Sequence, residues 1–529
     1  MLMGAPKRRG IAKVTDESRA SNAPGILLII CVAIFFGVLN ASALGVVLPD
    51  IARDLSVDTG QLSWLMTGFL LVYGIAIPFY GRLADLYGAR PLFLIGVAIF
   101  SVGSLLSAVA PTFSLLLAAR IVQAAGGAAV PGLGMTLASR AYGAGARGTV
   151  LGVLAATIGV GGAMGPLLGG ALSDSLGWQS IFVVSAVAAL TIPVGLRILP
   201  RDEPRTGGNL DLLGGVALAL MVTGALLIPS EGSRSGWSSP LVLSGAVMAI
   251  VGIVALSARQ LTADSPFIPR EFLRNLRYVA LLGMGSSASA ASLAPLVGLP
   301  ILLATLHSLS PLEVGLTMLP GAIASSLFGV LAGRLTDRAG PRLPAWMGSP
   351  LILLAVLGLS TSSGSSVWVV ATFAGILGAG SGLMNTPVAA TIPRIVGSRV
   401  LASALSINSM AFFLGGGFGT AALMAVVTSR GQGGLSSVNP LHSGAGTAYS
   451  DAFLLLAVPV LVAMALSLAL PGAARPAAEP RPVEVEPAPV VSRNWVDNCS
   501  VPWTPECEEA KAGHSESVAP AIEAEYART

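Results

Sequence analysis

Long apolar segments alternate with short polar ones along the chain as far as residue 471. A bilayer core about 30 Å thick needs about 20 apolar residues per helix. Fourteen segments approach or exceed that length, near residues 26–48, 62–80, 91–110, 113–138, 149–171, 179–199, 211–229, 240–258, 278–304, 312–332, 343–361, 367–391, 401–427 and 452–470. The pattern predicts an all-α integral membrane protein, in which the Gly and Pro within several segments are tolerated better than in soluble helices.

One polar loop occurs twice in the chain. Residues 81–90 read GRLADLYGAR and residues 333–342 read GRLTDRAGPR, so six of ten positions are identical at a separation of 252 residues. Each copy lies between two apolar segments. A membrane–loop–membrane unit that recurs half a protein apart indicates a transporter built from two homologous halves.

Composition excludes several other classes of protein. Only 11% of the 529 residues are charged, whereas soluble domains carry about 25%. Cys31 lies in the first apolar segment and Cys499 and Cys507 in a polar tail, so the three cysteines form no disulfide framework. A metal site at Cys499 and Cys507 is the alternative, but seven residues separate them. Without a catalytic triad, metal cluster or phosphate-binding loop, we expect neither an enzyme, a cofactor nor a metal.

Basic residues fix the predicted orientation. With the N-terminus in the cytoplasm, 26 of the 30 Lys and Arg residues fall in cytoplasmic segments, and only Arg53, Arg234 and Arg430 fall outside. This asymmetry follows the positive-inside rule. The first apolar run exceeds the roughly 7–15 residues of a signal peptide's apolar region. We therefore expect both termini in the cytoplasm, with the net charge of +4 reflecting topology and no nucleic-acid partner.

The duplicated loop resembles the loop between the second and third helices of the major facilitator superfamily. Residues 39–55, LNASALGVVLPDIARDL, are similar to the same region of fourteen-helix drug/proton antiporters, especially their tetracycline-exporter relatives. The resemblance to this group covers about residues 40–200 well and the second half loosely. It implies the major facilitator fold, with two six-helix bundles and two helices inserted between them, in the plasma membrane of a bacterium.

The implied fold divides the chain into five parts. The last part is rich in Pro, Glu and Ala, which cannot bury enough surface to fold alone, so we expect a disordered cytoplasmic tail. The parts are a basic leader (1–25), an N-terminal bundle (26–200), two inserted helices with linkers (201–276), a C-terminal bundle (277–471) and the tail (472–529).

The two loop copies are candidates for gating. An Asp beside a helix N-terminus is favoured by the helix dipole, and neighbouring Arg side chains can pair with it. The resemblance implies that the loops hold the two halves together while the cytoplasmic side is closed; a plain positive-inside turn is the alternative. The expected gating residues are Gly81, Arg82, Asp85, Gly88, Arg90, Gly333, Arg334, Asp337, Gly340 and Arg342.

Arg120 lies in the interior of a predicted span, whereas Arg197 lies at the cytoplasmic end of its span, and Gln123 shares the helical face of Arg120. A charge at that depth is costly unless it faces a partner or a wet cavity. An Arg close to the membrane surface could instead extend its side chain to water. The segment resembles the superfamily's Arg-x-x-Gln-Gly motif, which implies a role in proton transfer for Arg120 and Gln123. We expect this pair to organise proton coupling with a nearby acid, for which Asp50 and Asp85 are available.

The fifth span contains a motif of small residues. Its members are Gly152, Gly161, Gly165, Pro166, Gly169 and Gly170. Small residues allow helices to approach closely, and a generic packing face is the plain interpretation. The spacing matches a motif of the export branch of the superfamily, so the resemblance implies outward transport.

The spans lack an acid near their middle, although proton antiport usually needs an embedded carboxylate. The tetracycline group carries a Glu in the thirteenth span, where residues 408–419 of this chain offer Gly instead. Coupling would then use Asp85, Asp50 or the Arg120 region, or the carrier is not a proton antiporter. Candidate pocket residues are the polar and aromatic side chains within spans, Asn40, Tyr73, Gln123, Asn385, Asn408, Phe412 and Phe413; the Asn residues could equally join helices.

These observations predict a monomeric secondary transporter that exports small hydrophobic or amphipathic drug-like compounds, exchanging them for protons across the lipid bilayer. An exporter of an endogenous metabolite, such as a sugar, a lipid precursor or a self-made antibiotic, is the main alternative. A carrier without proton coupling is another. A membrane sensor that does not transport would lose its gating residues, and both loops are intact.

Overall fold

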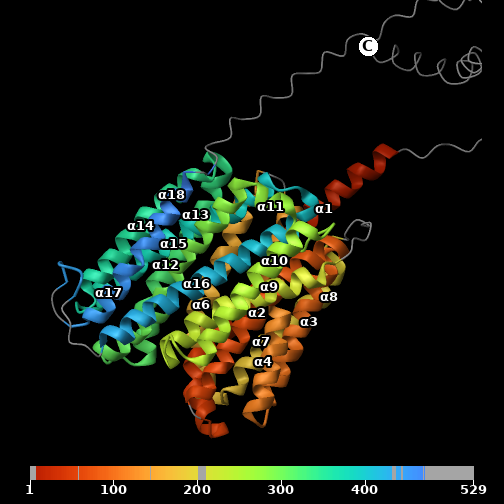
Figure 1. Cartoon of the computed structure of the whole chain (residues 1–529). Coiled ribbons are helices and arrows are strands. Elements are labelled where there is room, and N and C mark those ends of the chain that lie inside the picture. Colours follow the sequence, from red (N-terminus) through yellow and green to blue (C-terminus); the bar gives the residue numbers. More distant parts are fainter. Residues whose placement is uncertain are drawn as a thin grey trace, which may run out of the picture. The chain divides into compact units, whose positions relative to one another are not determined.

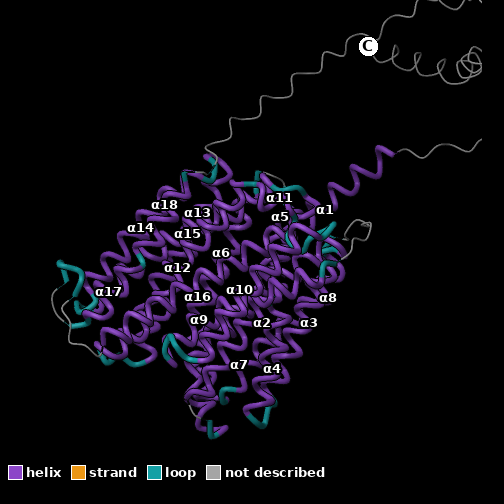
Figure 2. Tube along the Cα trace, viewed as in Figure 1, coloured by secondary structure: helices purple, strands orange, loops and turns teal. Residues whose placement is uncertain are grey.

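A computed structural model of the chain describes residues 8–57, 59–142, 145–200, 210–431, 437–442, 445–468 and 470. Within this part every regular element is a helix (Figure 2). The predicted tail, residues 472–529, lies outside the described residues, as do residues 201–209 of the first linker.

The helices form two halves joined by an inserted pair (Figure 1). The first half comprises α1 (Arg8–Leu55), α2 (Thr59–Tyr87), α3 (Ala89–Ala108), α4 (Phe113–Gly127), α5 (Ala129–Ala141), α6 (Arg147–Leu176), α7 (Gln179–Ala186), η1 (Val187–Leu190) and α8 (Thr191–Ile198). The inserted pair is α9 (Leu212–Ser235) and α10 (Pro240–Thr262). The second half comprises α11 (Arg270–Arg274), α12 (Leu276–Leu306), α13 (Pro311–Ala339), α14 (Arg342–Ser362), α15 (Val367–Ile395), η2 (Ser398–Val400), α16 (Leu401–Gly431), α17 (Thr447–Leu455) and α18 (Ala457–Ser467).

The predicted spans correspond closely to these helices. In the described part of the chain, 13 segments are long and apolar enough to cross a membrane, and α9 adds a shorter apolar stretch, Leu212–Ile228. The fold therefore agrees with the predicted all-α membrane architecture and its fourteen segments. Helix α1 already begins at Arg8, so it includes most of the predicted leader.

In the part of the chain that the structure describes, three spans are interrupted, each three residues before a proline. The breaks occur at Ala128 between α4 and α5, at the 3-10 turn Val187–Leu190, and at Leu456 between α17 and α18. Proline lacks the N–H that would close the preceding helical turn. The prolines that follow the three breaks are Pro131, Pro193 and Pro459, and each lacks this N–H.

Close helix packing depends on small residues in both halves. In the first half a Cβ atom at Gly103 of α3 would lie 2.4 Å from the Gln123 backbone nitrogen of α4. In the second half a Cβ atom at Gly419 of α16 would lie 2.2 Å from the Ala290 carbonyl oxygen of α12. Because only glycine fits such distances, these positions set how closely the helices approach.

The inserted helix α9 lies against both halves. Leu226 of α9 is within van der Waals distance of a Cβ built at Gly74 of α2 and close to one built at Gly417 of α16. At the start of α9, the Asp211 carboxylate accepts hydrogen bonds from Gly214 N and from Arg259 Nη2 of α10, at 3.0 and 2.8 Å. The capping carboxylate thus fixes the inserted pair as one unit along the seam between α2 and α16.

Candidate functional site

The first loop copy contacts the opposite half of the molecule. Asp85, near the end of α2, accepts hydrogen bonds from the backbone nitrogens of Ala402 and Ser403, at 3.1 and 2.9 Å. Both donors belong to the first turn of α16. A Cβ atom at Gly81, one turn earlier, would lie 2.5 Å from that of Ser406. The glycine allows the approach, and the carboxylate caps a helix N-terminus across the seam.

The second copy makes the reciprocal contact. Asp337, near the end of α13, accepts hydrogen bonds from the backbone nitrogens of Gly148 and Thr149, both at 2.8 Å, and from the Thr149 hydroxyl at 2.9 Å. These donors form the first turn of α6. A Cβ atom at Gly333 would lie 2.2 Å from the Gly148 carbonyl oxygen. Each half therefore caps a helix of the other, and we call this end of the bundle the latch end.

The remaining loop residues serve different purposes. Gly88 and Gly340 have φ of 100° and 84°, a left-handed region that favours glycine. The backbone conformation therefore explains why glycine occurs at this position in both loop copies. The Arg90 guanidinium donates to the Leu196 carbonyl oxygen, and that of Arg342 lies 5.7 Å from the centre of the Trp346 ring. Arg82 Nε is buried without a hydrogen-bond acceptor, and Arg334 is exposed.

Arg120 is buried inside the first half, with 1% of the residue exposed. Its Nη1 donates to Asn40 Oδ1 at 2.7 Å and to Gln123 Oε1. Asn40 Nδ2 in turn donates to the Ser185 hydroxyl at 2.9 Å, and Gln123 Nε2 to the Ser104 hydroxyl at 2.6 Å. The predicted Arg120–Gln123 pair is therefore formed, and burial excludes extension of Arg120 to surface water.

No carboxylate contacts Arg120 among the described residues. Asp50, which we expected to act with it, forms an ion pair with Arg53 and accepts a hydrogen bond from Ser173 Oγ at 2.7 Å. Asp85 is engaged at the latch. The structure thus brings Arg120 together with Gln123 and Asn40, and it does not bring Asp50 to them.

An aromatic series leads from Arg120 to the seam between the halves. The guanidinium carbon lies 4.1 Å from the centre of the Phe69 ring, a cation–π distance. Phe69 stacks on Tyr73 at 5.5 Å between ring centres, and Tyr73 meets Phe413 of α16 edge-on at 5.1 Å. Phe412 packs on Phe413 in the same way at 5.6 Å. Three of the predicted pocket residues therefore form one aromatic cluster between α2 and α16.

The other predicted pocket residues are separated. Asn40 and Gln123 are fully buried in the Arg120 network. Asn408 is buried in α16, and Asn385 of α15 is half-buried with its Oδ1 lacking a hydrogen-bond partner. Asn40 and Gln123 thus share one network in the first half, and Asn385 and Asn408 lie on helices of the second half.

The small-residue motif of α6 faces two neighbours. A Cβ atom at Gly165 or Gly169 would lie 2.5 Å from Ser42 Cβ or 2.9 Å from Ala43 Cβ of α1, and one at Gly161 would lie 3.1 Å from the Phe35 carbonyl. Gly152 instead faces α13, where a Cβ would lie 2.5 Å from the Gly329 carbonyl. Pro166 lies inside the same helix, and Gly170 has room, with 3.9 Å to Val46.

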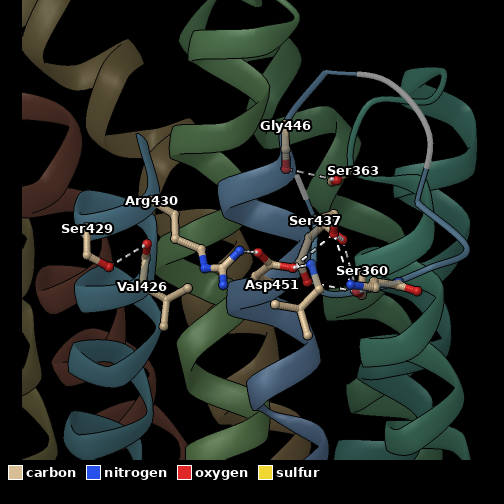
Figure 3. A network of polar contacts seen from close by, with 11 residues as sticks. Ser360, Ser363, Val426, Ser429, Arg430, Ser437, Gly446 and Asp451 are labelled. Atoms are coloured by element: carbon tan, nitrogen blue, oxygen red, sulfur yellow. Dashed lines mark hydrogen bonds and ion pairs between the residues drawn. The ribbon is translucent and has the colours of Figure 1, made fainter. Parts of the chain in front are cut away.

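A polar network at the opposite end was not predicted from the sequence. Arg430, at the end of α16, forms an ion pair with Asp451 of α17 (Figure 3). Asp451 also accepts hydrogen bonds from Ser437 Oγ and Val438 N, at 2.9 and 2.7 Å. The loop is further held to α14, because Asn439 Nδ2 donates to Ser360 Oγ at 2.8 Å. The sequence signals were the basic residue Arg430 outside the membrane and an Asp just before the last predicted span.

Comparison with known proteins identifies the family. A family model described as Major Facilitator Superfamily matches residues 30–420. The chain belongs to this superfamily. That assignment confirms the predicted family and fold class, and it makes the chain a multi-pass membrane protein of a transporter family.

Individual members of the superfamily resemble most of the chain. The cephamycin export protein CmcT of Amycolatopsis lactamdurans is 31% identical over 493 residues, which cover 88% of this chain and 96% of that protein. The multidrug resistance protein Stp of Mycobacterium tuberculosis is 29% identical over 75% of this chain and 74% of its own length. The crystal structure of the human organic anion transporter MFSD10 (TETRAN) shares the fold, with a TM-score of 0.60 at 14% identity, covering 84% of this chain and 99% of that one.

Proposed function

We propose that this chain exports small amphipathic, drug-like compounds by alternating access between its two halves. The reciprocal latch carries the proposal. Asp85 and Asp337 each cap a helix of the opposite half through backbone hydrogen bonds. Such contacts can break and reform without unfolding either half, which is what a carrier needs to open and close one end.

The relatives support export as the direction and antibiotic-like compounds as the cargo. One is named as a cephamycin export protein and another as a multidrug resistance protein. The first name also favours the second candidate, export of an endogenous antibiotic. Genes of antibiotic biosynthesis beside that of this protein would favour the second candidate over general drug efflux.

The latch end is assigned to the cytoplasm, because 26 of 30 basic residues fall on that side. Charge pairing at the opposite end supports this orientation. Arg53 and Arg430, two of the three basic residues assigned outside, pair with Asp50 and Asp451. The paired carboxylates therefore compensate these two positive charges on the outer side, where the positive-inside rule disfavours basic residues.

Cysteine labelling tests this orientation in a variant without the native cysteines. Trp237→Cys, before α10, is expected to react with an impermeant maleimide added to intact cells. Leu261→Cys, near the other end of α10, is expected to react only after permeabilisation; both positions are exposed. The opposite pattern would reverse the assignment.

Protons drive the export in this proposal, and Asp85, which joins the two halves at the latch end, is the acid at which we test the coupling. As anions, Asp85 and Asp337 accept hydrogen bonds from helix N-termini, where negative charge is favoured. When these hydrogen bonds break, the latch end is free to open. Arg120 itself cannot release a proton at physiological pH.

The test of the function is transport by purified protein in proteoliposomes that contain a pH-sensitive dye. An amphipathic antibiotic to which expression confers resistance is the substrate. We expect substrate movement with coupled proton movement for the wild type, and neither for Asp85→Asn. Asp264→Asn removes an exposed acid outside the latch and is expected to behave as wild type.

Two results would reject parts of the proposal. Substrate transport without any proton movement would replace antiport by a carrier that is not coupled to protons. Absence of both resistance in cells and transport in proteoliposomes, across a broad panel of compounds, would reject export altogether.

A further inference from the structure

The Arg120 environment has an unusual charge balance. Arg120 is 1% exposed, and the neighbours of its guanidinium are the neutral side chains of Asn40 and Gln123 and the rings of Phe69 and Phe182. A buried charge is costly unless an opposite charge or a full set of hydrogen bonds compensates it. Among the described residues, neither compensation is complete.

Asn40 occupies the position where a counter-ion would be most effective. Its Oδ1 lies 2.7 Å from Arg120 Nη1, and its amide nitrogen donates to Ser185 Oγ at 2.9 Å. An Asp differs from Asn by one atom and would place a negative charge directly on the guanidinium. The side chain present here orients Arg120 and leaves its charge unneutralised.

Donor groups of Arg120 also remain unused. A guanidinium carries five N–H groups in a planar fork that matches a carboxylate. The described hydrogen bonds of its side chain all start from Nη1, and Nε is buried without an acceptor. An oxyanion that approached this side would gain charge-assisted hydrogen bonds and neutralise the buried cation.

We propose that Arg120 binds the anionic group of the transported compound, so that the substrates are amphipathic organic carboxylates with an aromatic or apolar body. This proposal rests on the proposed export function. Phe69 covers the guanidinium and must turn aside to admit the carboxylate. The apolar body then lies along Tyr73 and Phe413, which continue the aromatic series toward the seam.

Binding to purified full-length protein in detergent tests the proposal without requiring transport. The probes are 2-naphthoate, neutral 2-naphthamide and cationic 2-naphthylmethylammonium, which share one aromatic body. We expect naphthoate to bind at least about tenfold more tightly than naphthamide, because charge-assisted hydrogen bonds are about twice as strong as neutral ones. Equal affinities for the three probes in isothermal titration calorimetry would overturn the proposal.

Two substitutions test whether the preference for naphthoate arises at Arg120. Asn40→Asp supplies an internal counter-ion, so we expect the preference for naphthoate to fall about tenfold or more while naphthamide binding stays the same. Asn439→Asp adds the same charge at a buried Asn in the opposite-end network, away from the proposed site, and is expected to retain the preference. If Asn40→Asp kept the full preference while eluting as a folded monodisperse species, Arg120 would not be the anion site.

Binding and export can fail independently in these experiments. A wild-type protein that exports drugs from cells but binds the three probes equally would disprove the anion site and leave the export function intact. Selective naphthoate binding by a protein that exports nothing would support the anion site and reject the export function.

Discussion

The two halves of this transporter place Asp85 and Asp337 in the same way, yet among the described residues a buried Arg occurs only in the first half. Asp85 caps α16 and Asp337 caps α6, each through two backbone nitrogens of a first helical turn. Inside the first half, Arg120 joins Asn40 and Gln123 in a polar network. In the second half, Met284, Val356 and Phe453 belong to a large hydrophobic core, and the described ion pair of Arg430 with Asp451 lies at the end opposite the latch.

This difference separates two tasks. Opening and closing one end of the bundle requires contacts between the two halves. A loop that is present in both halves can supply these contacts from each side. Recognition of a small molecule requires specific groups at one place, and a single half can supply them. The contacts of the proposed gate thus recur in both halves, whereas the Arg120 network lies in the first half.

The largest expected effect comes from breaking the symmetry of the latch. Asp85→Asn and Asp337→Asn each replace a charged acceptor of two backbone N–H groups, and hydrogen bonds to charged groups contribute about 1.5–3 kcal/mol each. We expect either change to lower export by more than tenfold while the protein still inserts. Efflux rates normalised to membrane protein level measure it. Wild-type export by either variant would show that the two copies are not equivalent gates.

Substitution of Arg120 sharpens the contrast between the interiors. We expect Arg120→Ala to abolish uphill export, while relief of the buried charge offsets the lost hydrogen bonds and keeps the unfolding free energy within about 2 kcal/mol of wild type. Arg120→Lys retains the charge without the planar fork and is expected to keep part of the activity. Ser101→Ala, which removes a buried hydroxyl without a partner in the same half, serves as the control. Normal export by Arg120→Ala would show that the buried Arg of the first half has no special role in transport.

We expect the smallest effect from Gly→Ala substitutions at helix contacts, and we expect their effect on stability to be similar in the two halves. Gly165→Ala forces a Cβ to 2.5 Å from Ser42 Cβ in the first half, and Gly419→Ala forces one to 2.2 Å from the Ala290 carbonyl in the second. Such overpacking costs about 1–3 kcal/mol. Gly170→Ala has 3.9 Å of room and should be neutral or slightly stabilising. Thermal unfolding in detergent measures all three, and equal melting temperatures would contradict the packing argument.

Much of the site was predictable because its signals are local. The pair Arg120 and Gln123 shares a face through helical spacing, and the structure joins them. The expected link from Arg120 to Asp50 was not formed, because Asp50 has its own partners in Arg53 and Ser173. The Arg430–Asp451 pair was missed, because nothing in the spacing of those residues brings the end of α16 to α17.

The sequence by itself determined the spans, the repeated loop and the two-half organisation, and it predicts the orientation. These follow from bilayer thickness, residue spacing and the count of basic residues, all of which act on short stretches of chain. Only the tertiary structure decided which groups meet. Asp85 finds its donors 317 and 318 residues away, and Arg120 finds Asn40 80 residues away. Such partners are selected by helix packing, since a buried charge can be satisfied only by the groups that neighbouring helices bring to it.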